Sequence, residues 1–111
     1  MMTGTASSTA KVPTAHASKY LQQLCKHWQH NLAVEYSADE GRVTFPKNVR
    51  GADWPDDAIV HFRAEAEALN VRIEASIDAQ RDGLKEVVAR HLDRFAFREA
   101  PLAFAWEDAA T

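Results

Sequence analysis

The feature that most constrains the fold is a change in the spacing of apolar residues along the chain. Over residues 15–30, and again over residues 84–95, apolar side chains recur every three or four positions, which predicts two amphipathic helices. Elsewhere apolar and polar residues alternate, which predicts strands with one buried face. A chain with this pattern can bury its apolar surface by placing both helices on one side of a sheet.

Each predicted helix has one clear apolar stripe. The first stripe consists of Leu21, Leu24, Cys25 and Trp28, and the second of Leu84, Val87, Val88, His91, Leu92 and Phe95. Thr14 is placed to cap the first helix, and Ser76 or Asp78 to cap the second, because their side chains can accept hydrogen bonds from free amides. Pro101 prevents the second helix from continuing.

Alternation predicts strands over residues 7–12, 33–36, 42–45, 58–64, 69–75 and 102–106. Tight turns near residues 38–41 and 65–67 make the joined strands antiparallel. The expected fold is α+β, a two-layer sandwich of about six antiparallel strands with two helices on one face, in the order β-α-β-β-β-β-α-β. Within it, residues 1–8 are expected to be a flexible leader, 9–107 a single domain and 108–111 a tail. The order of strands in the sheet is not readable from the pattern.

Residues 47–57 are predicted to form a loop because they contain proline, glycine and several polar residues. Trp54 lies inside this loop. It is either a lid over the core or an exposed contact residue.

Composition limits the classes of partner. With 13 Lys and Arg against 16 Asp and Glu, the net charge is -3, which argues against a nucleic acid partner. The single cysteine, Cys25, excludes an internal disulfide and fits a reducing compartment. No stretch reaches the roughly 20 apolar residues that span a bilayer, and the N-terminus lacks the pattern of a secretory signal. We therefore expect a cytoplasmic protein without a membrane partner.

Signatures of common enzymes are missing from the sequence. It has no glycine-rich phosphate loop, no Gly-x-Ser-x-Gly sequence and no paired Cys-x-x-Cys. This favours a role other than catalysis.

The histidines are the main candidates for a binding site. His27 and His30 are three residues apart on the first predicted helix, and His91 belongs to the stripe of the second. If the helices pack side by side, His91 approaches His27, and two imidazoles with a thiolate would suit a transition metal or a haem iron. The alternative is structural: His91 bonds a carbonyl in the core while His27 and His30 face water.

Two further groups have both a functional and a structural interpretation. Cys25 lies on a buried stripe, so a small packed side chain is favoured over a reactive thiol. A basic surface for an acidic small molecule or a partner protein can be built from Lys26, His27, Arg90, Arg94 and Arg98, although an ordinary solvated helix face is the favoured explanation. His61 and Arg63 are assigned to the solvent face of a strand.

Two segments resemble a known family. They are residues 20–28, followed by His30, and residues 91–99, followed by a strand ending in Trp106. Together they are similar to the bacterial domain-of-unknown-function family 2218 over residues 10–106, and the chain departs from it in the longer, more polar loop 47–57. The polar positions that match are His27, His30, His91, Arg94, Arg98 and Glu99.

The resemblance implies a link to iron. Members of the family are encoded beside, or fused to, siderophore-interacting reductases and iron-uptake components. The first hypothesis is a binding module for iron, haem or a ferric siderophore, with His27, His30 and His91 as ligands and Lys26, Arg94, Arg98 and Glu99 as contacts to an anion or a partner. The second is a protein-interaction module that docks on a siderophore reductase or transporter without a small ligand. A third, an enzyme with a borrowed cofactor, ranks last. A homodimer paired through a sheet edge is compatible with the first two.

Overall fold

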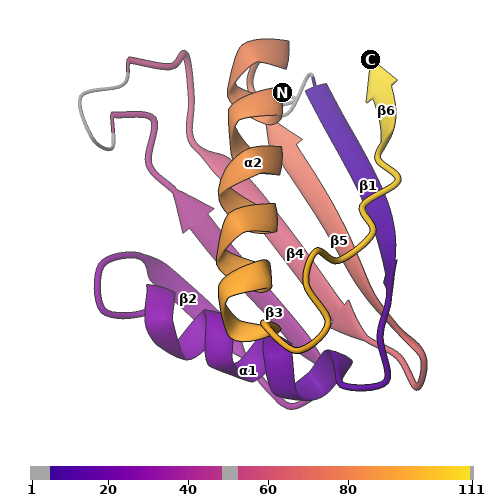
Figure 1. Cartoon of the computed structure of the whole chain (residues 1–111). Helices are drawn as coiled ribbons and strands as arrows, with labels where there is room; N and C mark the ends of the chain where they lie inside the picture. The colour runs from indigo at the N-terminus through magenta and orange to yellow at the C-terminus, as the bar shows by residue number, and fades with distance from the viewer. Residues whose placement is uncertain (1–5, 49–52, 111) are drawn as a thin grey trace.

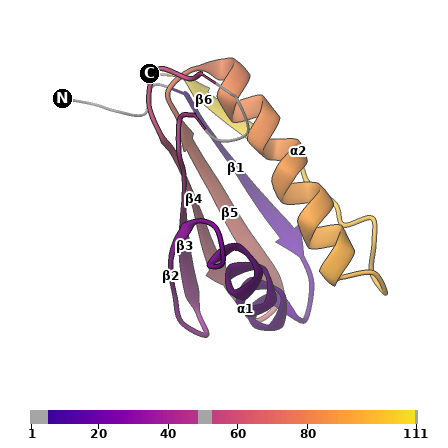
Figure 2. The ribbon, with the colours of Figure 1, turned by 90° about the vertical axis from the view of Figure 1, so that its left-hand side faces the viewer.

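The computed structural model describes residues 6–48 and 53–110. These residues form six strands and two helices in the predicted order. The elements are β1 (Ala6–Pro13), α1 (Ala17–Trp28), β2 (Ala33–Tyr36), β3 (Glu40–Phe45), β4 (Ala58–Ala64), β5 (Ala68–Ala75), α2 (Asp78–Phe95) and β6 (Glu107–Ala110). The α+β class and the two helices on one face of the sheet are confirmed (Figures 1 and 2).

All neighbouring strands in the sheet are antiparallel, in the order β2-β3-β4-β5-β1-β6. The first strand of the chain is therefore inserted between β5 and the last strand. One row across the sheet places Val43 beside Val60 and Val60 beside Ile73, and all three are fully buried. Because side chains alternate between faces, the neighbouring positions point to the other side of the sheet.

The helices cover the inner face of the sheet in different directions. Helix α2 runs along the strands, whereas α1 crosses the strands next to the C-terminal end of α2 (Figure 1). The predicted stripes are the packed surfaces: Leu21, Leu24 and Cys25 of α1, with Val88 and Leu92 of α2, have no exposed surface. Neither described helix combines the length and hydrophobicity that crossing a bilayer requires.

The helix caps differ from the prediction. Helix α1 begins at Ala17, and Thr14 accepts a hydrogen bond from the His16 amide (3.1 Å) without making a side-chain cap. Helix α2 begins after Ile77, which makes no side-chain cap bond, so the predicted caps at Ser76 and Asp78 are wrong. Instead the Gln80 carboxamide oxygen accepts a bond from the Ser76 amide (2.8 Å). A side chain from inside the helix thus accepts a hydrogen bond from the backbone just before the first turn.

The ends of the sheet also differ from the prediction. Residues 102–106 are not a strand, although Leu102, Phe104 and Trp106 are half-buried as the alternation indicated. Strand pairing begins at Glu107, where β6 joins β1. Strand β1 starts at Ala6, so the sheet takes in residues 6–8 of the predicted leader, whereas residues 1–5 lie outside the described residues.

Candidate functional site

A cavity of about 510 Å³ lies between the end of α1, the side of α2 and the connection from β3 to β4. Its walls are largely aromatic and aliphatic: Trp28, Phe45, Trp54, Leu32, Leu84 and Val87. Its polar lining comes from His27, Asn31, Gln80, Arg90 and His91. A mainly apolar cavity of this size with a few converging polar groups is typical of sites for organic ligands.

The wall formed by Trp54 is held to α2. The Gln80 carboxamide nitrogen donates a hydrogen bond to the backbone carbonyl of Asp56 (2.9 Å), and the Trp54 amide donates to the Lys47 carbonyl (2.9 Å). Gln80 is buried, so its bonds are shielded from water. Trp54 is half-buried at the cavity, so of the two interpretations of this residue, its position fits the lid better.

The two helices bring His27 and His91 together. Their ring centroids are 5.7 Å apart, and His91 also lies 5.1 Å from the ring of Trp28. Nδ1 of His91 is 2.7 Å from the Val87 carbonyl oxygen, which can only accept, so Nδ1 carries the proton. In the neutral ring this leaves the lone pair on Nε2, the arrangement found in metal-binding and hydrogen-bond-accepting histidines.

His27 lies in a positive environment. Partial burial of its ring, together with the nearby His91, Arg94 and His30, holds the pKa of His27 below its ordinary value of 6.5. Its edge packs against Phe95, with centroids 5.7 Å apart. At neutral pH the ring is therefore neutral and can act as a ligand or an acceptor.

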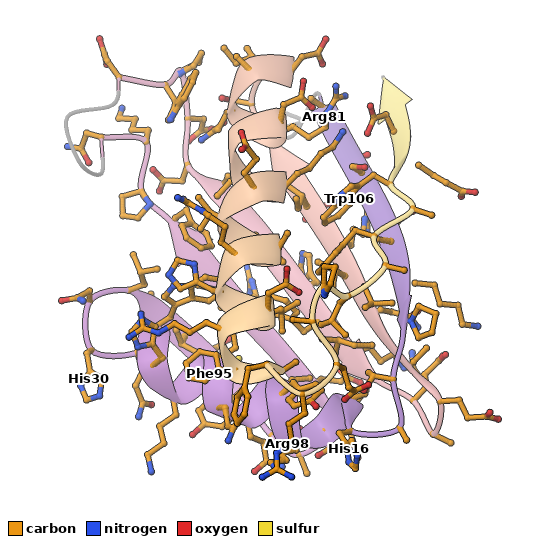
Figure 3. All side chains as sticks on the ribbon, in the orientation of Figure 1. His16, His30, Arg81, Phe95, Arg98 and Trp106 are labelled. Carbon is orange, nitrogen blue, oxygen red and sulfur yellow. The ribbon has the colours of Figure 1, made fainter. Side chains whose placement is uncertain are left out.

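The other predicted ligands lie elsewhere. His30 is exposed beyond the end of α1 and does not line the cavity (Figure 3). Cys25 is fully buried in the core, and burial raises the pKa of its thiol to about 11. Among the described residues no group of three or more His, Cys, Asp or Glu is placed to hold a metal ion. The donors therefore do not form a closed site for a bare ion, which needs about four ligands.

The predicted cationic contacts lie near the C-terminal ends of the two helices, with Lys26 in the last turn of α1 and Arg94 in the last turn of α2. Lys26, Arg94 and Arg98 are exposed, and none of them lines the cavity. The guanidinium of Arg98 lies over the exposed ring of Phe97, 5.7 Å from its centroid. Of the basic surface expected from the sequence, only Arg90 and His27 reach the cavity.

Glu99 points inward instead. Its carboxylate accepts hydrogen bonds from the Tyr20 hydroxyl and from Thr14 Oγ1 (3.1 Å). The bond from Tyr20 holds the pKa of Glu99 below its ordinary value, and the same bond raises the pKa of Tyr20. Glu99 thus ties the segment after α2 to the start of α1.

Sequence reasoning did not identify Phe45 or Asn31 as part of the site. Its position at the end of a predicted strand indicates only that Phe45 is an ordinary core residue. Its edge-on contact with Trp28, with ring centroids 5.1 Å apart, depends on how α1 crosses the sheet. No local pattern carries that information.

Comparison with known proteins places the chain in a family. The NMR structure of PA4090 from Pseudomonas aeruginosa is similar, with a TM-score of 0.71, 27% sequence identity and coverage of 91% of this chain and 94% of that chain. A search of curated proteins finds no match. A family model described as "Uncharacterized protein conserved in bacteria (DUF2218)" matches residues 9–107. The chain therefore belongs to the DUF2218 family of bacterial proteins.

Proposed function

We propose that this protein is a ligand-binding module whose site is the cavity beside α2, and that its ligand is an iron chelate of the siderophore class with aromatic iron-binding groups. The observation that carries the proposal is the meeting of Trp28, Trp54 and Phe45 with the imidazole of His91 in one cavity of about 510 Å³. Flat aromatic walls favour a ligand with a planar ring, and the volume fits an organic molecule.

The donor set favours a chelate over a bare ion. Among the described residues, only His27 and His91 bring imidazoles to the cavity, and a chelated ferric ion already carries its own oxygen ligands. Such chelates are commonly anionic, so the guanidinium of Arg90 attracts them, while Nε2 of His91 accepts a hydrogen bond from a water molecule bound to the iron. The link to siderophore-interacting reductases that the family resemblance implies is a second reason.

Ligand binding can be tested with the ferric complex of 2,3-dihydroxybenzoate. Because Trp28 and Trp54 line the cavity, saturable quenching of tryptophan fluorescence is expected at one equivalent. His91→Ala is expected to weaken binding by about tenfold, the effect of losing one hydrogen bond to a charged or polar ligand. The matched control is His30→Ala, which removes an exposed imidazole outside the cavity and leaves the affinity unchanged.

Two results would contradict the proposal. One is equal binding by wild type and His91→Ala with both proteins folded. The other is an equal loss in His91→Ala and His30→Ala, which would indicate adsorption of iron to surface histidines. Repeating the titration with iron-free 2,3-dihydroxybenzoate shows whether the metal is needed.

A second candidate function is docking on a siderophore-interacting reductase or transporter. The observation that favours it is Phe97, whose side chain is 70% exposed just after α2. Phenylalanine and arginine are both enriched at protein–protein interfaces relative to the rest of the surface. If this surface is the contact, Phe97→Ala abolishes binding to the purified reductase in calorimetry while His91→Ala has no effect. If instead His91→Ala abolishes this binding and Phe97→Ala has no effect, docking through Phe97 is rejected.

A further inference from the structure

A second, larger cavity lies on the opposite face of the sheet. It is an open groove of about 1050 Å³ whose floor comes from β1, β3, β4 and β5. Both helices cover the other face, so the described residues leave this one open (Figure 2). Among the described residues, five side chains that carry or can carry positive charge line the groove. We call them the basic groove: Lys11, Arg42, His61, Arg63 and Arg72.

The strand register fixes how these side chains are arranged. Arg42 lies opposite His61, and His61 lies opposite Arg72, so the three form one row across β3, β4 and β5. Arg63 is two residues further along β4 and therefore lies diagonally beside both Arg42 and Arg72. With strands about 4.8 Å apart, the backbones that carry Arg42 and Arg72 are only about 10 Å apart. Three arginine side chains thus project from one small area of the same face.

The charges in this area are only partly balanced within the fold. Glu74 pairs with Arg72 (3.1 Å) and with His61 (2.8 Å), and Lys11 pairs with Glu65 at 3.6 Å. Within the described part of the chain, neither Arg42 nor Arg63 forms an ion pair.

Carboxylates are available to both of these arginines. Glu35 lies directly opposite Arg42 in the register, and Glu40 lies opposite Arg63, yet neither pair closes to salt-bridge distance. Like charges in neighbouring strands are destabilising. Two unpaired guanidinium groups in such a cluster can therefore gain energy from an external anion.

The distribution of acidic residues limits the size of that anion. The acidic residues that line the groove are Glu35 on the edge strand β2, Glu40 at the start of β3 and Glu107 on the edge strand β6. They surround the positive centre and would repel a polyanion that extends past it. A long nucleic acid is disfavoured for this reason, and a compact anion is favoured.

We propose that the basic groove binds a small organic polyanion, of the class that carries a diphosphate, a triphosphate or several carboxylates. Arg42 and Arg63 bind its anionic groups with paired N–H donors, the geometry in which guanidinium binds phosphate and carboxylate, and Arg72 adds charge at the side. The groove and the cavity beside α2 lie on opposite faces of the sheet. A negative result for one proposal therefore leaves the other unaffected.

The test uses pyrophosphate, tripolyphosphate and citrate as probes, each titrated into the full chain while backbone amide NMR shifts are followed. Saturable shifts confined to β3, β4 and β5 are expected, and they should weaken as ionic strength rises. The double variant Arg42→Ala/Arg63→Ala is expected to bind about tenfold or more weakly. The ratio of pyrophosphate to citrate affinity identifies which anionic group the groove prefers.

The matched control is Lys19→Ala/Lys47→Ala, which also removes two positive charges but at exposed positions outside the groove. Its affinity should stay within about twofold of wild type, because distant charges act only through the screened overall field. An equal loss in both double variants, or no localised shifts at millimolar probe, would overturn the proposal. Since Arg42 and Arg63 are exposed, their variant is expected to fold, and a circular-dichroism melt checks this.

Discussion

Gly41→Ala is expected to lower the free energy of unfolding by about 1–3 kcal/mol, the range found when a methyl group is forced into a packed core. Gly41 lies in β3 beneath α1, and a Cβ atom there would lie 2.7 Å from Sγ of Cys25. Cys25 has no exposed surface, so its side chain can move only by displacing its packed neighbours. Chemical denaturation followed by tryptophan fluorescence measures the loss.

Two controls separate this contact from a general effect of replacing glycine. Gly83 in α2 would place a new Cβ atom in open space, so Gly83→Ala should raise stability by about 0.5–1 kcal/mol through helix propensity. In a Cys25→Ala background, the methyl group of Gly41→Ala occupies space left by the sulfur, so the second substitution should cost little. If the effects of Cys25→Ala and Gly41→Ala simply add, the Sγ contact is not the cause.

The same contact illustrates why the fold was more predictable than its details. The apolar stripe that contains Cys25 follows from helical spacing alone, and its complete burial is confirmed. That the stripe packs over Gly41 depends on the angle between α1 and the sheet, which no local pattern encodes. The sequence therefore predicted which face of α1 is buried but not the residue beneath it.

The incorrect last strand has a similar cause. Alternation reports which side chains are buried, and Leu102, Phe104 and Trp106 are indeed half-buried, with the rings of Phe104 and Trp106 stacked 5.6 Å apart. Alternation does not report whether the backbone finds a hydrogen-bonding partner. Pairing with β1 begins only at Glu107.

Long-range polar bonds hold β6 in place once pairing begins. Asp108 accepts a hydrogen bond from the buried Ser8 (2.7 Å) and pairs with Lys85 (2.7 Å) and Arg81 (3.4 Å). Ser8 lies in β1 and the two cations in α2, and no local pattern links these positions to the end of the chain. The partners of Asp108 could therefore not be read from the sequence.

The candidate site was predictable only where helical spacing determined it. His91 belongs to the stripe of α2 and His27 flanks the stripe of α1, so their approach was expected from packing of the two helices, and the rings are 5.7 Å apart. His30 shares the chemistry of His27 but lies past the end of α1, where helical spacing no longer applies. Trp54 comes from an irregular connection, so its place in the cavity wall could not be deduced.

Glu99→Ala is expected to destabilise the protein by about 1–3 kcal/mol at pH 7, because it leaves buried hydroxyl groups without their acceptor. The hydroxyls belong to Tyr20 and Thr14, both of which are almost fully buried. Tyr20→Phe removes one of them, so its combination with Glu99→Ala should cost less than the sum of the two single changes. Urea denaturation of the four proteins measures the coupling, and additive effects would show that the hydrogen bond contributes nothing.

The same carboxylate makes stability depend on pH in a defined direction. The pKa of Glu99 in the folded protein is lowered from its ordinary value of 4.5, so folding favours its ionised form. Its contribution is therefore complete above pH 4.5 and is lost as the pH falls through the lowered folded pKa. Glu99→Gln cannot ionise, so wild type should exceed this variant by about 1 kcal/mol at neutral pH, and the gap should close in acid. Asp82 and Asp108 also have lowered pKa values, but both proteins contain them, so their effect cancels in the difference. A gap that stays constant from pH 7 to acid would mean that the hydroxyls of Tyr20 and Thr14 do not stabilise the charge on Glu99.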